Sequence, residues 1–219
     1  MRISHDRKFV FLSLPRAASL TVRKALNPYS DIKSKRKSDI THTNPFWHHT
    51  RACEAKEIFE EKNWSWGNYR TFCFVRNPYD RVVSAYKRRW EENYGWHSTG
   101  RPVRDVKSFL RDVFFKPIPF EAFVRESNPE KGYSISIYNF THDSEDNCLV
   151  DDILKFENLP ENLVDYLGFE LEISIDRRSV GHYHKSESRK KYKSYHTEKT
   201  KRIIRRQYRM EIEEFGYGF

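Results

Sequence analysis

The segment from Phe72 to Tyr86 constrains the fold of this chain more than any other part of its sequence. It opens with apolar and aromatic residues, Phe72-Cys-Phe-Val75, which are typical of a buried strand. Arg76-Asn-Pro78 ends this run, and proline at the first position of a helix sacrifices no hydrogen bond. Apolar side chains then recur at helical spacing, at Val82, Val83, Tyr86 and Trp90. The segment therefore predicts a strand, a tight turn and a helix in direct succession.

The predicted helix also carries a polar face, formed by Arg81, Ser84 and Arg88 at positions i, i+3 and i+7. Arg76 adds a cation at the carboxyl end of the predicted strand. Arginine forms the charge-assisted hydrogen bonds that a phosphate group accepts. Ligands of open α/β sheets bind beyond the carboxyl ends of the strands. The pattern therefore predicts a phosphate site, and the alternative is a basic helix face in solvent.

A second strand, turn and helix lie near the N-terminus. Lys8–Leu14 is almost continuously apolar, as in a parallel strand that is covered on both faces. The short loop Pro15–Thr21 follows, and the helical segment after it ends at Asn27-Pro28. Backbone N–H groups at a helix N-terminus attract anions. The loop therefore predicts an anion cradle that contains Arg16, with a plain turn as the alternative; it lacks the G-x-x-x-x-G-K-[ST] pattern of a Walker A loop.

Together these two elements resemble the PAPS-dependent sulfotransferases, in the branch that modifies carbohydrates. Leu14-Pro-Arg-Ala-Ala-Ser-Leu-Thr21 is similar to the 5′-phosphosulfate loop of that family, usually written P-K-T-A-G-T-S. Arg76-Asn-Pro-Tyr-Asp-Arg-Val-Val-Ser-Ala-Tyr86 matches its 3′-phosphate motif, R-N-P-x-x-R-x-x-S-x-Y, at every position. The segments His49–Ala52, Ile153–Leu159 and Glu214–Tyr217 extend the likeness through most of the chain.

The resemblance implies an α/β fold of the P-loop-kinase-like sulfotransferase type. Residues 1–219 would form one domain, with a mostly parallel central sheet flanked by helices. The implied sulfuryl donor is PAPS (3′-phosphoadenosine 5′-phosphosulfate), with adenosine 3′,5′-bisphosphate as product and no metal ion. The implied acceptor is a hydroxyl group, on a sugar or a glycolipid. The residues expected to hold the donor are Pro15, Arg16, Ala17, Ala18, Ser19, Leu20, Thr21, Arg76, Ser84, Arg189 and Lys190.

The resemblance also implies catalytic roles for four residues. His49 is the expected base, because Ala52 follows it at the family's offset, and the neighbouring His48 is the second choice. Histidine suits this role, since its ordinary pKa is about 6.5. Arg16 is expected to stabilise charge on the leaving group, and Glu157 to orient the base or the acceptor. The alternatives are that the histidines pack or cap and that Glu157 forms an ion pair.

The first loop departs from the family pattern. Arg16 stands where the family usually has lysine, and arginine keeps the charge but cannot donate a proton to the leaving group. Ala17 and Leu20 replace hydroxyl-bearing residues, and each lost charge-assisted hydrogen bond is worth roughly 1.5–3 kcal/mol. The sequence of this loop is therefore compatible with full sulfotransferase activity and with reduced activity.

The composition favours an anionic partner and a reducing compartment. Lys and Arg number 40 against 31 Asp and Glu, so the formal charge is +9. The cysteines, Cys53, Cys73 and Cys148, are odd in number and widely spaced, which indicates neither a disulfide framework nor a metal site. No apolar run approaches the ~18 residues of a membrane span, and the first residues lack a signal-peptide pattern. We therefore expect a cytoplasmic protein without a transmembrane segment.

The remaining pattern alternates helices with one further strand, as expected for an α/β domain. Because Arg16 and Arg76 both follow strand ends, we expect them to line one crevice. The other predicted elements are helices at Ala52–Glu61, Val106–Phe115, Phe120–Arg125 and Pro160–Leu167, a strand at Leu149–Phe156, and a final helix at Thr197–Phe215 that packs on the sheet.

Two other functions compete with sulfuryl transfer. A nucleotide-dependent phosphotransferase would need a magnesium-binding aspartate, for which Asp151 and Asp152 are the candidates. A nucleic-acid-binding module would explain the charge and the abundance of Arg, Tyr and Trp. The cations are spread along the chain, however, and no known nucleic-acid-binding motif occurs. His182 and His184 alternate like a metal pair but lack a third ligand, so a metal site is not expected.

Overall fold

A five-stranded sheet forms the centre of the protein. The computed structural model describes residues 1–93, 118–180 and 192–219. The strands lie in the order β3-β1-β2-β4-β5. Their bounds are β1 Arg2–Ser4, β2 Phe9–Leu12, β3 Ile32–Lys33, β4 Arg70–Val75 and β5 Asp152–Lys155. Since β1 pairs antiparallel with both neighbours and the other pairs are parallel, four of these strands point the same way. The sheet is mixed, and the predicted α/β class is confirmed.

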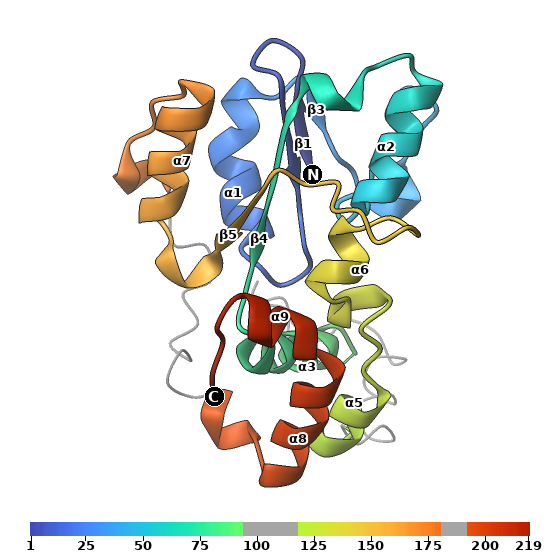
Figure 1. The fold of residues 1–219 in the computed structure, drawn as a ribbon, viewed down its shortest axis with the longest axis vertical. Coiled ribbons are helices and arrows are strands. Elements are labelled where there is room, and N and C mark those ends of the chain that lie inside the picture. The colour runs from blue at the N-terminus through green and yellow to red at the C-terminus, as the bar shows by residue number, and fades with distance from the viewer. Residues whose placement is uncertain (94–117, 181–191) are drawn as a thin grey trace, which may run out of the picture.

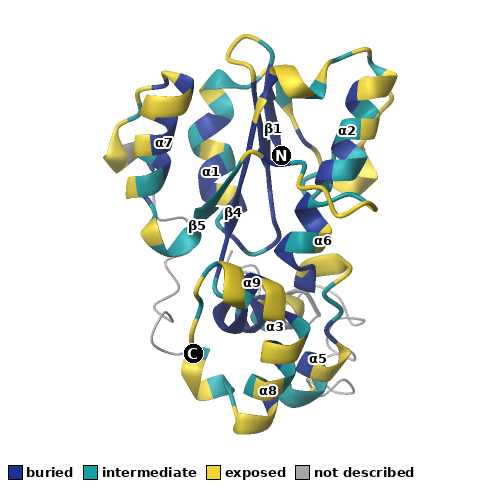
Figure 2. Cartoon of the chain, in the orientation of Figure 1, coloured by how far each residue is buried: buried dark blue, intermediate teal, exposed yellow. Residues whose placement is uncertain are grey.

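The middle of the sheet is apolar because β2 and β4 are covered on both faces. Every residue of β2 is fully buried, and in β4 only the first residue, Arg70, is exposed. Phe11 of β2 lies opposite Phe72 of β4 in the parallel register, with 5.3 Å between their ring centroids. Figure 2 shows β4 largely in the colour of buried residues. The continuous apolar runs in the sequence therefore correspond to the two central strands.

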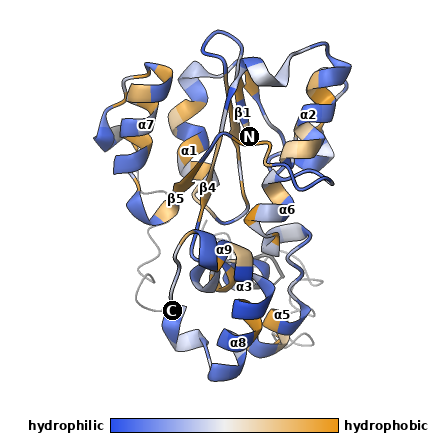
Figure 3. Cartoon of the chain, in the orientation of Figure 1, coloured by the Kyte–Doolittle hydropathy of each residue, from blue (hydrophilic) through white to orange (hydrophobic). Residues whose placement is uncertain are grey.

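Helices cover both faces of the sheet (Figure 1). On one side lie α1 and α7, and on the other lie α2 and α6. Each sends apolar side chains into the main core, for example Leu26, Leu167, Phe59 and Phe140. The hydropathy colouring of Figure 3 shows these helices as amphipathic, with polar residues outward. Their bounds are α1 Ser19–Leu26, α2 Ala52–Glu61, α6 Ile137–Thr141 and α7 Glu161–Leu171.

A second group of helices lies beyond the carboxyl end of β4 (Figure 1). It consists of α3 Pro78–Asn93, α5 Phe120–Glu126, α8 Glu198–Gln207 and α9 Arg209–Glu214. Its small core joins Val82 of α3, Phe123 of α5 and Ile204 of α8. The prediction of one final helix packed on the sheet is therefore wrong. The helix breaks at Tyr208, and α8 packs on α3 and α5 because its apolar stripe meets theirs.

Several other boundaries differ from the sequence-based expectation. Strands β1 and β3 were not predicted, since each is too short to show a period. The strand predicted at Leu149–Phe156 is shorter, and the helix predicted to end at Leu167 continues to Leu171. The predicted helix at Val106–Phe115 lies outside the described residues. The helices predicted at Ala52–Glu61 and Phe120–Arg125 are present.

Candidate functional site

Three chain segments meet where the parallel strands β2, β4 and β5 end. Residues 13–21 follow β2, Arg76 follows β4, and Phe156 follows β5. The Arg76 guanidinium donates from Nη1 to the backbone oxygen of Arg16 at 3.0 Å. The same guanidinium lies over the Phe156 ring, 4.4 Å from its centroid. The expected crevice residues Arg16 and Arg76 are thus brought together at the predicted edge of the sheet.

The loop after β2 has an unusual backbone. Arg16 and Ala18 both adopt left-handed conformations, with φ of 64° and 58°, which are uncommon for residues with a side chain and cluster at functional sites. Ser19 Oγ donates to Leu14 O at 2.7 Å and ties the loop to its own start. Ala18 is the N-cap of α1 and provides no side-chain acceptor, and the first turn holds no acidic residue. No side chain therefore caps the N-terminus of α1, and a helix end of this kind attracts anions.

Arg76 is buried and held in a fixed orientation. Its Nε and Nη2 donate to Asp80 Oδ2 at 3.0 and 2.7 Å, and both side chains are about nine-tenths buried. Asp80 lies one helical turn further along, in the first turn of α3. An arginine has five N–H groups. Within the described part of the chain, Arg76 uses three of them, so two remain for a phosphate group.

Arg16 contacts α3 directly. Its Nε and Nη2 donate to Ser84 Oγ at 3.0 and 2.8 Å. The contact joins the two predicted phosphate-binding motifs, since Arg16 belongs to the first and Ser84 to the second. With the bond from Arg76 to the Arg16 backbone, each arginine reaches across to the other motif. The two motifs therefore form one connected polar surface.

His49 lies beside the start of the loop. Its Nδ1 is 2.7 Å from Ser13 O, and because a carbonyl oxygen can only accept, Nδ1 carries the proton. Nε2 then bears the lone pair that a base needs. Burial lowers the pKa of His49 to about 3, far below its ordinary value. The imidazole is therefore neutral throughout the physiological range.

His48 faces a different environment. Its Nδ1 lies 3.1 Å from Ser34 Oγ, a hydroxyl that donates to Met1 O at 2.8 Å. Burial lowers the pKa of His48 to about 4. Of the two histidines, only His49 is hydrogen-bonded to the segment that leads into the loop. The choice of His49 over His48 as the base stays a prediction.

Glu157 has both carboxylate oxygens in use. Oε1 accepts from the backbone N–H of Asn77 at 2.8 Å, and Oε2 accepts from the Tyr217 hydroxyl at 3.0 Å. The residue therefore caps the start of α3 and ties it to the C-terminal segment, a role that sequence reasoning missed. Its expected part in orienting the base stays a prediction.

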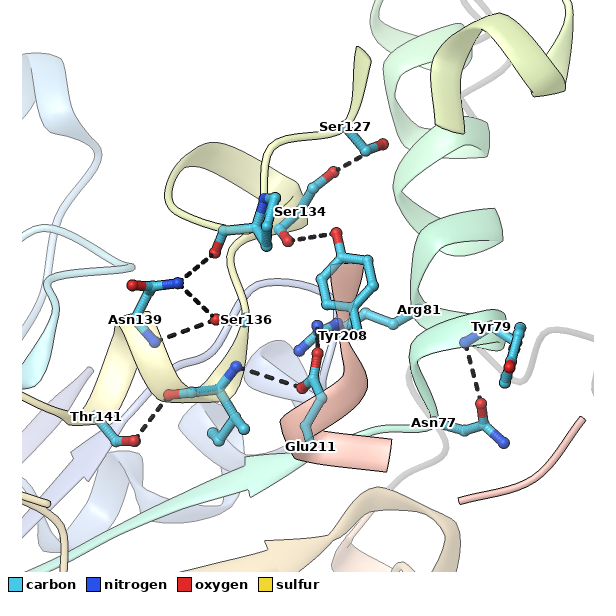
Figure 4. A network of polar contacts seen from close by, with 12 residues as sticks. Asn77, Tyr79, Arg81, Ser127, Ser134, Ser136, Asn139, Thr141, Tyr208 and Glu211 are labelled. Atoms are coloured by element: carbon cyan, nitrogen blue, oxygen red, sulfur yellow. Dashed lines mark hydrogen bonds and ion pairs between the residues drawn. The ribbon is translucent and has the colours of Figure 1, made fainter. Parts of the chain in front are cut away.

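Arg81 lies neither on the predicted polar face with Ser84 nor on a basic face in solvent, because its side chain is buried. Its Nη2 donates to Glu211 Oε1 at 2.6 Å, and both side chains are only 1% exposed. Glu211 also accepts from the backbone N–H of Ile137, as Figure 4 shows. Burial raises the pKa of Glu211 and the neighbouring Arg81 cation opposes that rise. Arg81 therefore joins α3 to α9 and α6.

The remaining expected donor residues vary in their surroundings. Pro15, Ala17, Ser19 and Thr21 are buried, and Leu20 is exposed. Arg189 and Lys190 lie outside the described residues, as do His182 and His184. Among the residues that the structure describes, no cluster of three or more His, Cys, Asp and Glu side chains could hold a metal ion.

The aspartates of the phosphotransferase alternative lie at the other end of β5. Asp151 Oδ2 accepts from the backbone and the hydroxyl of Thr71, at 2.8 and 2.7 Å. Asp152 forms an ion pair with Arg70 at 2.7 Å. Both carboxylates therefore bind protein groups at the amino-terminal edge of the sheet, away from the crevice, so neither supports a magnesium site in the crevice.

Sequence reasoning missed three residues of the site. Asp80 could have been found, because its spacing of four from Arg76 on a helix favours an ion pair. Phe156 gave no such signal. Tyr133, whose ring centroid lies 6.3 Å from that of His49, is 84 residues further along the chain, so only the tertiary structure reveals it.

Comparison with known proteins gives one match. The chain matches the family model described as "Sulfotransferase family" over residues 1–218. No curated protein and no solved structure matches it. Within the described ranges, no helix has the length and apolar character to cross a membrane.

Proposed function

This chain belongs to the sulfotransferase family, and on that premise we propose that it moves a sulfuryl group from PAPS to a hydroxyl group of a carbohydrate or glycolipid. The observation that carries the proposal is the contact between the two motifs, through Arg16, Ser84 and Arg76. It creates one polar surface with two places for anionic groups. A nucleotide with anionic groups on both its 3′ and 5′ oxygens suits such a surface.

The residues present fit this donor. The loop and the first turn of α1, which no side chain caps, would hold the 5′ group. Arg76 and Ser84 would donate to the 3′-phosphate. PAPS supplies the activated sulfuryl group when it is bound, and no metal ion is needed in this scheme.

The chain's own groups then assist the transfer. His49 Nε2 takes the proton of the acceptor hydroxyl, while Ser13 O holds the ring through Nδ1. The acceptor oxygen forms the new bond to sulfur as the bond from sulfur to the phosphate oxygen breaks. Arg16 stabilises the negative charge that develops on that oxygen, without giving up a proton.

Ligand-dependent melting tests the donor. Adenosine 3′,5′-bisphosphate should raise the melting temperature well above the value in AMP, ADP, ATP or NAD at equal concentration, because only the bisphosphate fills both anion positions. Equal stabilisation by AMP and the bisphosphate would contradict the proposal. Magnesium-dependent stabilisation by ATP would favour a phosphotransferase instead.

We also keep the single-domain organisation and the cytoplasmic location as proposals. The first is supported by a main core that draws on residues from Met1 to Val180. The second is supported by the three cysteines, all of which are free in the structure.

A further inference from the structure

A second cavity lies next to the candidate base, and we propose that it is the acceptor pocket and that it holds one acidic sugar residue. This inference rests on the proposed function, because it names the acceptor for the same site. The cavity measures about 190 Å³. It is lined by Ala85, Arg89, Phe123, Glu126, Ser127, Asn128 and the segment 131–134.

Tyr133 connects the cavity to the chemistry. It lines the cavity, and its ring stands edge-on to that of His49, at an interplanar angle of 77°. At 44% exposure it is among the more exposed large apolar side chains of the described residues. A ligand that rests on the Tyr133 ring therefore lies within reach of the imidazole.

The backbone around Tyr133 is firmly held. Ser134 is buried, its backbone oxygen accepts from the Tyr208 hydroxyl at 2.7 Å, and its side chain bonds to Ser127 Oγ (Figure 4). Gly132–Ser134 form one turn of 3₁₀ helix, and Gly132 has φ of +70°. Tyr133 is thus exposed on a rigid support. An exposed ring of this kind offers an apolar face on which a sugar ring can stack.

The polar groups of the cavity suit a sugar with a negative charge. Arg89 and Lys131 contribute two cations and Glu126 one anion, so the lining carries an excess positive charge. Within the described part of the chain, Lys131 forms no ion pair. Asn128 Oδ1 accepts from Glu130 N at 2.7 Å, and its amide nitrogen, which has no acceptor among the described residues, can donate to a hydroxyl. A carboxylate on the sugar pairs with Lys131.

The cavity borders the same helix, α3, as the donor site. Ala85 follows Ser84 directly on α3, and Ser84 contacts Arg16. His49 is hydrogen-bonded to Ser13, which leads into the same loop. The cavity is therefore connected to the donor surface through α3 and through His49.

A further cavity is not a competing acceptor site. It measures about 380 Å³ and is lined by residues that include Arg7, Trp66 and Arg70. Arg70 begins β4, so this cavity lies at the amino-terminal edge of the parallel strands, opposite the donor loop. Arg70 is already paired there with Asp152 and Glu170, and Arg7 is paired with Asp6.

Glycan binding by matched variants tests the pocket. The probes are unsulfated tetrasaccharides of hyaluronan, chondroitin and polygalacturonate, which carry carboxylates, and neutral cellotetraose. Affinity is measured by calorimetry and saturation-transfer NMR, with adenosine 3′,5′-bisphosphate present. The variants are Tyr133→Ala, Tyr133→Phe and Lys131→Ala. The controls are Phe169→Ala, an exposed aromatic on α7, and Lys33→Ala, an exposed cation on β3.

We expect at least one carboxylated probe to bind at least about tenfold more tightly than cellotetraose. Tyr133→Ala should weaken that binding about tenfold, and Lys131→Ala should weaken it and reduce the preference for carboxylate. Tyr133→Phe should retain most of the affinity, and both controls should match the parent protein. The assignment is overturned if no carboxylated probe binds, or if Tyr133→Ala and Lys131→Ala bind as the controls do.

The bisphosphate melting shift, measured on the same preparations, separates this inference from the proposed function. If the bisphosphate still raises the melting temperature but substitution of Tyr133 or Lys131 leaves glycan affinity unchanged, the acceptor binds elsewhere. A missing shift in the parent protein overturns the sulfotransferase proposal itself, and with it the acceptor assignment.

Discussion

The guanidinium of Arg16 donates two hydrogen bonds to the hydroxyl of Ser84, which lies 68 residues further along the chain, at 3.0 and 2.8 Å. Arg76 in turn donates a hydrogen bond to the backbone oxygen of Arg16. The same two arginine side chains that we propose to hold the donor therefore also fix the loop after β2 relative to α3 and to the end of β4. Substitution of either arginine is therefore expected to alter donor binding and the shape of the site together.

Arg76→Ala should abolish the preference for adenosine 3′,5′-bisphosphate over AMP. The charge-assisted bonds to the 3′-phosphate contribute roughly 1.5–3 kcal/mol, which is on the order of ten- to a hundredfold in affinity. Melting shifts with both nucleotides measure the difference. Arg206→Ala, at an exposed position on α8, is the matched control and should keep the preference. A preference that survives Arg76→Ala would remove Arg76 from the donor site.

Arg16→Ala should lower turnover more than donor affinity, since charge on the leaving oxygen develops mainly in the transition state. Arg16→Lys restores the residue that is usual in the family and should retain or raise activity. Steady-state kinetics together with bisphosphate affinity check this. Equal losses of turnover and affinity in Arg16→Ala would mean that Arg16 only holds the nucleotide.

His49→Ala should reduce turnover by about 10²–10⁴-fold with donor affinity intact, the usual range for a positioned base. His48→Ala should be milder, because His48 is bonded to Ser34 rather than to Ser13. An unperturbed histidine would predict loss of activity near pH 6.5, but burial lowers the pKa of His49 to about 3. Turnover should therefore persist to about pH 5. Near-normal turnover in both variants would make the histidines structural and Glu157 the next candidate.

Stability should fall as the solution is acidified, and His49 should account for part of that loss. Its folded pKa of about 3 lies below the unfolded value of about 6.5. Between these limits the unfolded chain binds the proton and the folded chain does not, so the free energy of unfolding decreases as pH falls from about 6.5 towards 3. At about pH 5 the loss from His49 is ~2 kcal/mol.

Thermal melts at several pH values measure this dependence. His49→Gln should flatten the slope between about pH 7 and pH 5, because the substituted residue does not titrate. His42→Gln, at an exposed position, should leave the slope unchanged. An identical slope in His49→Gln would show that the folded protein accepts the proton readily.

Glu211→Gln should destabilise the protein by about 3–5 kcal/mol, since it leaves the Arg81 charge buried without its partner. Urea denaturation gives the free energy of unfolding. Glu213→Gln removes an exposed partner of Arg209 instead, and should change stability by no more than ~0.5 kcal/mol. Similar effects of the two substitutions would mean that water reaches the buried pair.

Much of the site could be predicted because its signals are local. A strand that ends at Arg76-Asn-Pro78, and another that ends before the loop containing Arg16, are patterns of adjacent residues. Parallel strands bring their carboxyl ends to one edge, so the meeting of these segments followed from chain order. The missed strands β1 and β3 have three and two residues and offer no period to detect.

What the sequence by itself determined is the α/β class, the two motifs and their place at the strand ends, because these depend on residues close together in the chain. Tertiary structure alone decided the partners that lie far apart in the chain. The spacing of Arg81 suggested a face shared with Ser84, yet Glu211, 130 residues away, draws it into the interior. Likewise His49 and His48 are neighbours in sequence, and their different contacts arise from segments packed against them. Such pairings depend on long-range packing, where burial favours whichever partner satisfies a charged or polar group.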